Sequence, residues 1–489
     1  MSSSLLNEAD DPSFTSFHNI VSGKPRRSEK TSQTVNPATL EKLWVISVAT
    51  EQDVEDAVTA AKNAFQTWKN TSFEERIELL KGWGDACRPH LKQFGEIIMK
   101  ENGKPESREL LVNSRPITVL TRPSIIFRAV SLKMPEENHT VNDRDYHVRY
   151  TPLGVVVAIC AWNFPLGQPI MKALPALMAG NCCIIKTSPF TPYSGMKVVE
   201  LAQRFLPPGV LQVLSGDDRL GPWLTHHSGV DKISFTGSTA SGRKVAEAAA
   251  RGLKRVTLEL GGNDPAIICP DVDVDKIAPD LCFGAFWNTG QVCTAVKRIY
   301  IHQDIYTPML DAMARAVHKW KVGMGTEDGA IFGPIQNEMQ YQKVRRLFEE
   351  VKQKGYVAKV GGEVKETKGF FLEPTIIDNP PPSSLLVTEE QFGPIVPAIP
   401  WSSEEEVIQS ANNSSMGLGA SVWTKDFDRA RRIAEQLEAG SVYINSYEKV
   451  SFRVPFGGHK DSGIGYECGP NALVPFCNMQ VLHYNFKTP

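Results

Sequence analysis

The sequence predicts an α/β protein with two doubly wound α/β domains and a small additional β arm. Between residues 154 and 260 five short strand-like runs alternate with helical segments, and a second alternation of the same kind begins after Gly262. Parallel neighbouring strands require crossover helices, so each alternation predicts a parallel sheet covered by helices. The segments 139–150 and 480–486 alternate polar and apolar residues instead. They predict strands that pair outside the two sheets.

Length and composition favour a multidomain globular protein. A chain of 489 residues is too long for one ordinary core. Its formal net charge of −2 gives no reason to expect a nucleic acid or an anionic membrane as partner. The nine cysteines are scattered, and without paired C-x-x-C spacing they predict neither a disulfide framework nor a metal site. No secretory leader or membrane-spanning run is recognisable, so we expect a cytoplasmic protein.

The first alternation follows a polar N-terminal segment, in which we expect an edge strand at 17–21, and a helical pattern over 51–103. Strands are expected at 155–160, 182–186, 210–214, 232–236 and 256–259, the first of them entirely apolar, as in strands covered on both faces. Helices are expected between them at 166–179, 193–205, 220–226 and 240–250. Ligands bind such sheets beyond the carboxyl ends of the strands, where Asn163, Lys186, Gly237 and Glu259 fall.

The second alternation predicts another α/β domain of the same type. Its strands are expected at 266–269, 298–302, 395–399, 420–424 and 441–445. Helices are expected at 306–319, 340–354 and 428–438.

Cys293 and Glu259 are candidates for a nucleophile and a base. Cys293 follows a helix and a turn broken by Gly290, and a cysteine on a turn can be exposed and ionised to the nucleophilic thiolate. The alternative is an inert buried thiol. Glu259 closes an apolar strand, where loss of solvent raises the pKa of a carboxyl group and makes it a usable base. The alternative is a glutamate that caps a helix or forms a salt bridge.

Two further strand ends carry groups that can bind negative charge. Asn163 lies just before a helix, where its amide can stabilise an oxyanion or, alternatively, cap the helix. Gly237 and Ser238 form a turn before a helix N-terminus, which offers backbone N–H groups and a helix dipole to a pyrophosphate. The turn lacks the G-x-G-x-x-G fingerprint, so this pattern alone does not identify a dinucleotide site.

Taken together, these motifs resemble the aldehyde dehydrogenase superfamily. The resemblance begins at VNPATLE (35–41) and continues through WNFP (162–165), FTGS (235–238), LELGG (258–262) and GQVCTA (290–295). It ends with EEQFGP (389–394) and PFGGHKDSG (455–463), and so extends over nearly the whole chain. It implies a non-acylating, NAD(P)-dependent enzyme that oxidises an aldehyde to a carboxylic acid.

The resemblance implies a role for each matching position. Cys293 attacks the aldehyde carbon, and the oxyanion of the resulting thiohemiacetal is held by the Asn163 side chain and the Cys293 backbone N–H. Hydride transfer leaves a thioester, which is hydrolysed by water that Glu259 activates. The implied cofactor contacts are Trp162, Lys186, Gly237, Ser238, Glu390 and Phe392. A looser implication is a tunnel for an apolar or aromatic aldehyde, lined by Phe164, Met171, Trp287, Val292, Thr294, Val450 and Phe456.

The resemblance also implies an organisation into domains. Residues 1–127 and 151–260 form a Rossmann-like cofactor domain, 261–470 a catalytic domain, and 128–150 with 471–489 an oligomerisation arm. We therefore expect a homodimer or homotetramer that takes a small-molecule aldehyde and holds no metal.

The sequence departs from the family pattern at a few positions. Pro189 stands where many NAD-preferring members carry a glutamate bound to the adenosine ribose, so NADP stays possible beside NAD. Ala161 replaces the proline that usually precedes Trp-Asn, which could loosen the loop that aims Asn163. Gln168 and Lys449 are polar at or beside tunnel positions, which leaves room for a substrate with a polar or anionic end.

Two other functions remain open from the sequence. One is a relative that transfers the acyl group to coenzyme A, against which the presence of Glu259 argues. The other is a non-catalytic binding protein on the same fold, against which the intact set of Cys293, Glu259, Asn163 and Lys186 argues.

Overall fold

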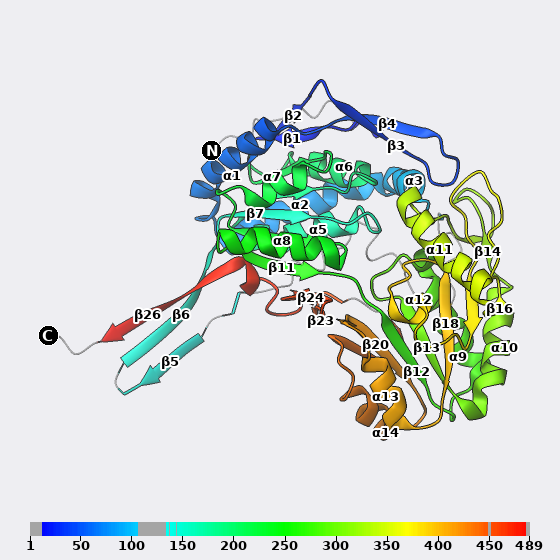
Figure 1. The fold of residues 1–489 in the computed structure, drawn as a ribbon. Coiled ribbons are helices and arrows are strands. Elements are labelled where there is room, and N and C mark those ends of the chain that lie inside the picture. Colours follow the sequence, from blue (N-terminus) through cyan, green and yellow to red (C-terminus); the bar gives the residue numbers. More distant parts are fainter. Residues whose placement is uncertain (1–11, 106–133, 136, 143, 448–450, 486–489) are drawn as a thin grey trace.

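The computed structural model describes residues 12–105, 134–135, 137–142, 144–447 and 451–485. Two large sheets flanked by helices and a projecting β arm make up the fold (Figure 1). The predicted α/β class is confirmed, because both sheets are mainly parallel and helices connect their strands.

The first sheet has eight strands in the order β2-β1-β9-β8-β7-β10-β11-β24. Five of them are parallel: β7 (Val155–Ile159), β8 (Cys182–Lys186), β9 (Leu211–Leu214), β10 (Lys232–Thr236) and β11 (Arg255–Glu259). These are the five strands that the sequence predicts. The expected strand near the N-terminus is β1 (Asn19–Val21), but it is not the edge, because β2 (Lys24–Arg26) pairs outside it.

The winding of this sheet reverses between β7 and β10. The chain passes from β7 through α5 (Gly167–Met178), β8 and α6 (Tyr193–Ala202) to β9, and returns through α7 (Leu220–His226) to β10 and through α8 (Thr239–Arg251) to β11. Right-handed crossovers place α5 and α6 on one face and α7 and α8 on the other. Ligands bind beside such a reversal, at the carboxyl ends of the strands.

Of the three N-terminal helices, α1 (Glu51–Trp68) packs on this sheet, whereas α2 (Phe73–Cys87) and α3 (Leu91–Asn102) pack on the helices that cover its other face. Capping boxes begin α1 and α2, where Thr50 and Ser72 accept hydrogen bonds from the backbone N–H groups three residues ahead. Gly103 ends α3 with a φ of 81°, a left-handed conformation that glycine adopts without strain. This turn brings the end of α3 beside the loop that follows β7.

The second sheet has seven strands in the order β16-β17-β18-β13-β12-β20-β21, all parallel except β16. The expected strands are β12 (Asp264–Ile268), β13 (Val296–His302), β18 (Ile395–Trp401), β20 (Gly419–Trp423) and β21 (Ser441–Ile444). β16 (Val357–Val360) and β17 (Thr375–Asp378) are additional. The helices described in this region are α9 (Val274–Phe286), α10 (Tyr306–Val317), α11 (Glu338–Lys354), the short α12 (Leu385–Thr388), α13 (Glu404–Asn412) and α14 (Phe427–Ala434).

The C-terminal part of the chain returns to the first sheet. There β24 (Gly463–Ile464) pairs antiparallel with β11. Ser462, which is fully buried, donates a hydrogen bond to the Gly261 carbonyl at 2.6 Å and accepts one from the Gly417 N–H at 2.9 Å. These bonds fix the segment 260–262, through which the chain passes from one sheet to the other. The domain limits at 260 and 470 stay a prediction, and β24 belongs to the first sheet although it lies beyond residue 260.

The arm is a three-stranded sheet in the order β26-β6-β5 that projects away from both large sheets (Figure 1). Its strands are β5 (Glu137–Val141), β6 (Arg144–Pro152) and β26 (Cys477–Asn485). The expectation of strands at 139–150 and in the tail that pair outside the main sheets is confirmed. No helix in the described part of the chain is long and apolar enough to cross a membrane.

Candidate active site

The loop that follows β7 carries Trp162, Asn163 and Phe164 and is held from two sides. Asn102 Nδ2 donates a hydrogen bond to the Trp162 carbonyl at 2.9 Å. Lys104 Nζ donates to the Asn163 carbonyl at 2.6 Å and lies 3.7 Å from the centre of the Phe164 ring. These bonds fix the backbone from which the Asn163 side chain projects.

The Asn163 carboxamide is buried and faces the turn that leads to Cys293. Its Nδ2 donates a hydrogen bond to the Gln291 carbonyl at 3.1 Å, and its Oδ1 accepts one from Gln168 Nε2 at 2.9 Å. The alternative that Asn163 caps a helix is wrong, because α5 begins after Leu166 and no side chain caps it. Asn163 and Cys293, distant in sequence, are therefore brought together.

The turn before Cys293 depends on unusual backbone geometry. Asn288 and Thr289 have φ values of 51° and 59°, and Gly290 has 72°. A Cβ atom on Gly290 would lie 2.2 Å from the Gly393 carbonyl oxygen, so only glycine fits there. Cys293 is partly exposed, whereas the other eight cysteines are buried. Burial raises the pKa of such thiols, in the case of Cys160 to about 12, and makes them inert.

Three sequence motifs meet behind Cys293. Lys297 Nζ donates a hydrogen bond to the Cys293 carbonyl at 2.6 Å and lies 3.6 Å from Glu390 Oε1. The same Glu390 oxygen accepts from the Gly262 N–H at 3.1 Å. A Cβ atom on Gly262 would lie 2.6 Å from the Cys293 carbonyl oxygen. The LELGG, GQVCTA and EEQFGP motifs therefore form one cluster, which fixes the backbone of Cys293.

Glu259 ends β11 as a buried carboxyl group. Among the described residues, neither of its side-chain oxygens has a hydrogen-bond partner. Burial raises the pKa of Glu259 well above its usual value, the negative charge of Glu467 raises it further, and the positive charge of Lys172 opposes both. Lys172 and Glu467 form a buried ion pair with 2.5 Å between Nζ and Oε1. A carboxyl group in this state can take a proton from water near neutral pH.

The predicted cofactor contacts lie at the carboxyl ends of the strands of the first sheet or opposite them. Lys186 ends β8, and burial lowers its pKa. Ser238 is exposed and caps α8, accepting a hydrogen bond from the Ser241 N–H at 3.3 Å. The rings of Trp162 and Phe392 meet edge to face with 5.2 Å between their centres, which joins the loop after β7 to the EEQFGP segment.

The structure brings together some of the predicted tunnel residues. Phe164 and Val292 pack in one apolar cluster with Trp287, whose ring centre lies 5.5 Å from that of Phe164. Thr294 is buried beside Cys293. Met171 packs instead against the core of the first sheet.

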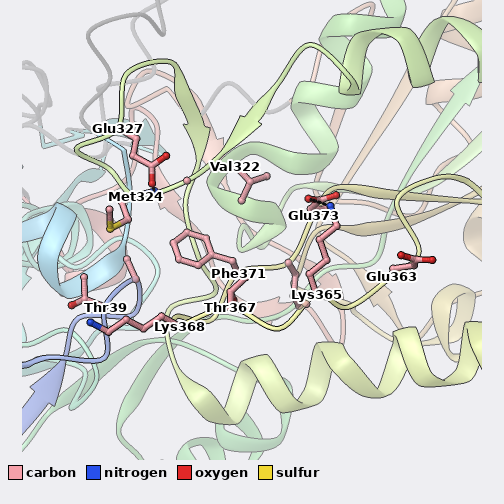
Figure 2. Close-up of a pocket in the computed structure, with 13 residues that line it drawn as sticks. Thr39, Val322, Met324, Glu327, Glu363, Lys365, Thr367, Lys368, Phe371 and Glu373 are labelled. Atoms are coloured by element: carbon pink, nitrogen blue, oxygen red, sulfur yellow. Dashed lines mark hydrogen bonds and ion pairs between the residues drawn. The ribbon is translucent and has the colours of Figure 1, made fainter.

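The remaining tunnel positions are not joined to this cluster. Phe456, in β22 (Pro455–Phe456), lines a cavity of about 190 Å³ with Val442 and Tyr443. Val450 and Lys449 lie outside the described residues. A larger cavity of about 530 Å³ lies elsewhere, between Thr39, the loop that carries Met324 and the segment 363–373 (Figure 2). No candidate site residue lines it.

Sequence reasoning missed several residues that support this site. Lys172 carried a signal, because a lysine within the apolar helix α5 has no ordinary reason to be buried. No such signal marked Asn102, Lys104 or Glu467, since each reaches the site only through tertiary packing.

The chain matches the aldehyde dehydrogenase family over residues 24–482. It is 43% identical over 465 residues to the putative aldehyde dehydrogenase FUS7 of Gibberella fujikuroi, covering 95% of this chain and 98% of that protein. It is 42% identical to the aldehyde dehydrogenase LUC3 of a Fusarium species, covering 96% and 99% of the two chains.

Solved structures give the same result. An aldehyde dehydrogenase of Bacillus cereus in complex with NAD+ is 33% identical, with a TM-score of 0.91 and coverage of 96% of this chain and 97% of that one. A betaine aldehyde dehydrogenase of Staphylococcus aureus in complex with NAD+ is 29% identical, with a TM-score of 0.91 and coverage of 97% and 96%. The predicted fold and enzyme class are confirmed: the chain belongs to the aldehyde dehydrogenase family.

Proposed function

We propose that this enzyme oxidises an aldehyde to a carboxylic acid with NAD(P)+, with Cys293 as nucleophile, Asn163 as oxyanion donor and Glu259 as general base. One observation carries the proposal. The partly exposed cysteine follows, by two residues, the Gln291 carbonyl that holds the Asn163 amide. A partly exposed thiol and an amide donor therefore lie at one place, which is the arrangement that addition to a carbonyl carbon requires.

One of the two N–H bonds of the Asn163 amide is left to donate to a reacting group. Its NH₂ group carries two N–H bonds. Among the described residues, this NH₂ group has one acceptor, the Gln291 carbonyl. We propose that the second N–H, together with the Cys293 backbone N–H, stabilises the oxyanion that forms when Cys293 attacks the aldehyde carbon.

Glu259 is proposed to serve the second half-reaction. Its unpaired oxygens and raised pKa suit a base that takes a proton from water as that water attacks the thioester at Cys293. A buried carboxyl group in this place favours hydrolysis over acyl transfer to coenzyme A.

The carboxyl edge of the first sheet fits a dinucleotide. The N-terminus of α8 and the Gly237–Ser238 turn can receive a pyrophosphate, while Lys186 and Glu390 supply a cation and an anion for ribose hydroxyls. The NAD+ complexes of the two bacterial relatives support NAD, and the exposed Pro189 leaves NADP possible. A nicotinamide bound there would supply the acceptor for the hydride of the thiohemiacetal carbon, so that aldehyde, NAD(P)+ and water would give acid, NAD(P)H and a proton.

The substrate is proposed to be an apolar or aromatic aldehyde. The apolar cluster of Phe164, Trp287 and Val292 lies between the loop after β7 and the Cys293 turn. Both ends of the Gln168 side chain bind within the protein, to Ala161 and Asn163, and a contact of Gln168 with a polar end of the substrate stays a prediction.

Substitution of the nucleophile tests the proposal. Cys293→Ser should lower aldehyde oxidation by more than about 10³-fold, because a hydroxyl group has a far higher pKa than a thiol and is a much weaker nucleophile near neutral pH. Cofactor binding, measured by fluorescence titration, should be nearly unchanged. Cys87→Ser, which removes a buried thiol from α2, is the matched control. Substantial turnover by Cys293→Ser would refute the assignment.

A further inference from the structure

A chain of three hydrogen bonds runs through the buried side chains of Gln168 and Asn163. The Ala161 N–H donates to Gln168 Oε1 at 2.6 Å. Gln168 Nε2 donates to Asn163 Oδ1 at 2.9 Å, and Asn163 Nδ2 donates to the Gln291 carbonyl at 3.1 Å. This series of hydrogen bonds therefore begins at a backbone donor and ends at a backbone acceptor beside Cys293.

The two backbone ends set the direction of both amides. A backbone N–H can only donate and a carbonyl can only accept, whereas a carboxamide can do either, depending on which way it is turned. The Ala161 N–H requires the oxygen of Gln168, which turns the Gln168 NH₂ group to Asn163. Asn163 must then present its oxygen to Gln168 and its NH₂ group to the Cys293 turn.

We infer that Gln168 is a positioning residue for catalysis, which holds the Asn163 carboxamide with its NH₂ group toward the reacting carbonyl. The inference rests on the proposed role of Asn163 as oxyanion donor. Gln168 suits this task because it projects from the first turn of α5, and its own backbone N–H donates to the Phe164 carbonyl at 3.1 Å. The side chain and the backbone N–H of Gln168 therefore both bind back to the segment 161–164.

The reversed orientation of Asn163 is excluded by two repulsive contacts. If the carboxamide were turned over, its NH₂ group would face the Gln168 NH₂ group and its oxygen would face the Gln291 carbonyl. Both residues are at least nine-tenths buried, so water cannot relieve these contacts. Without the Gln168 amide, only the contact with the Gln291 carbonyl would still oppose the reversal.

The backbone N–H of Ala161 is the first donor in this series of hydrogen bonds. Ala161 and Gln168 are two of the positions at which this sequence departs from the family resemblance, and the structure joins them by a direct hydrogen bond. A proline at position 161 has no N–H and could not direct the Gln168 amide. The two residues therefore act as a pair, and the Gln168 amide takes its orientation from Ala161.

The test compares Gln168→Met with the double variant Ala161→Pro/Gln168→Met. Methionine keeps the volume but removes both hydrogen bonds and leaves the Ala161 N–H, on a half-buried residue, without the Gln168 acceptor. We expect kcat to fall about 10- to 100-fold with a smaller change in KM, since misplacing a transition-state donor acts mainly on the chemical step. The double variant removes the unpaired donor, so its thermal midpoint should recover toward the wild-type value while kcat stays low.

Recovery of kcat along with stability in the double variant would overturn the inference, because Gln168 would then serve only to pair the Ala161 N–H. A wild-type kcat in Gln168→Met would overturn it as well. If the proline variant does not fold, a second comparison decides. In an Asn163→Ala background, where kcat should already be about 10²–10³-fold lower, Gln168→Met should cause no further loss.

A further multiplicative loss in that background would show that Gln168 acts independently of Asn163, and would overturn the inference. The proposed function itself fails in a different way. If Asn163→Ala alone keeps the wild-type kcat, Asn163 is not an oxyanion donor, whatever the Gln168 variants do.

Discussion

Two buried glutamates in this protein differ in the hydrogen bonds that their carboxylate oxygens accept, and we propose that this difference separates a general base from a structural residue. Glu101 is fully buried and accepts hydrogen bonds from the backbone N–H groups of Tyr193 and Ser194, and burial raises its pKa to about 7 in spite of them. Glu259 lacks such bonds among the described residues, and the charge of Glu467 adds to the effect of its burial. Glu101 therefore holds the N-terminus of α6, while Glu259 keeps its oxygens available for water.

Glu259→Gln should separate the two half-reactions. Glutamine has nearly the same shape but cannot take a proton from water, so the thioester should form and then persist. Rapid mixing with aldehyde and cofactor should show a burst of NAD(P)H of up to about one per active site, followed by turnover lowered about 10²–10⁴-fold. The trapped thioester should appear in a mass spectrum on the peptide that contains Cys293. Glu101→Gln makes the same change at another buried carboxyl group and should give no burst.

The dependence of steady turnover on pH follows from the raised pKa of Glu259. Only the ionised carboxylate can act as base, so the hydrolysis rate should increase as pH rises through that pKa. In Glu259→Gln this increase should disappear from the slow phase. If the slow phase of the variant keeps the wild-type pH profile and rate, Glu259 is not the base.

Residues at strand ends could be predicted from the sequence, but their partners could not. Asn163 follows one recognisable strand and Glu259 ends another, and parallel strands end at one edge of the sheet. The bond between Gln168 and Asn163 could not be predicted, because it depends on the path of the loop between β7 and α5. Glu467, which shifts the pKa of Glu259, is distant in sequence and follows no pattern of its own.

Among the elements, the ends of β7, β8, β10 and β11 together form the edge at which the candidate site lies. Pro189 is exposed and follows β8, three residues beyond Lys186. Proline offers no side-chain acceptor to a ribose hydroxyl and no negative charge to repel a 2′-phosphate. This strand end is therefore where the choice between NAD and NADP can be tested.

Pro189→Glu should shift preference toward NAD. A carboxylate can accept a hydrogen bond from the ribose 2′-hydroxyl but repels a 2′-phosphate, so the ratio of kcat/KM for NAD to that for NADP should rise by about tenfold or more. Pro189→Gln is the matched control, because it also removes the proline and has the same length without the charge. Equal ratios for the two variants would mean that the side chain at 189 does not face the ribose.

In the first sheet, the five parallel strands could be predicted from the sequence, whereas the very short β24 could not. The five parallel strands of the first sheet are four or five residues long, and most of their residues are buried. β24 has two residues, one of them glycine, and its pairing with β11 joins segments some two hundred residues apart. Such a pair has no periodicity, so only the folded chain reveals that Ser462 ties the LELGG turn in place.

For the molecule as a whole, the projecting arm is the feature most relevant to assembly, because two of its strands are sheet edges in the described part of the chain. Its two outer strands, β5 and β26, each pair with β6 on one side only, and exposed sheet edges of this kind favour pairing or packing with another chain. Met479 is 65% exposed and Val481 38%. Being two residues apart on β26, they lie on the same face of the arm. Apolar side chains in this position support the proposal that the arm joins subunits.

Carboxylates on that face should weaken the assembly. We expect the double variant Met479→Asp/Val481→Asp to have a lower mass than the wild type in light scattering after size-exclusion chromatography, because charges would have to be buried between subunits. The matched control is Asn478→Asp/Gln480→Glu, which places two carboxylates on the opposite face of the same strand and should keep the wild-type mass. If both variants keep that mass, this face of β26 is not an interface. If both variants have a lower mass than the wild type, the charge added to β26 weakens the assembly, and the face that carries Met479 and Val481 is not specifically the interface.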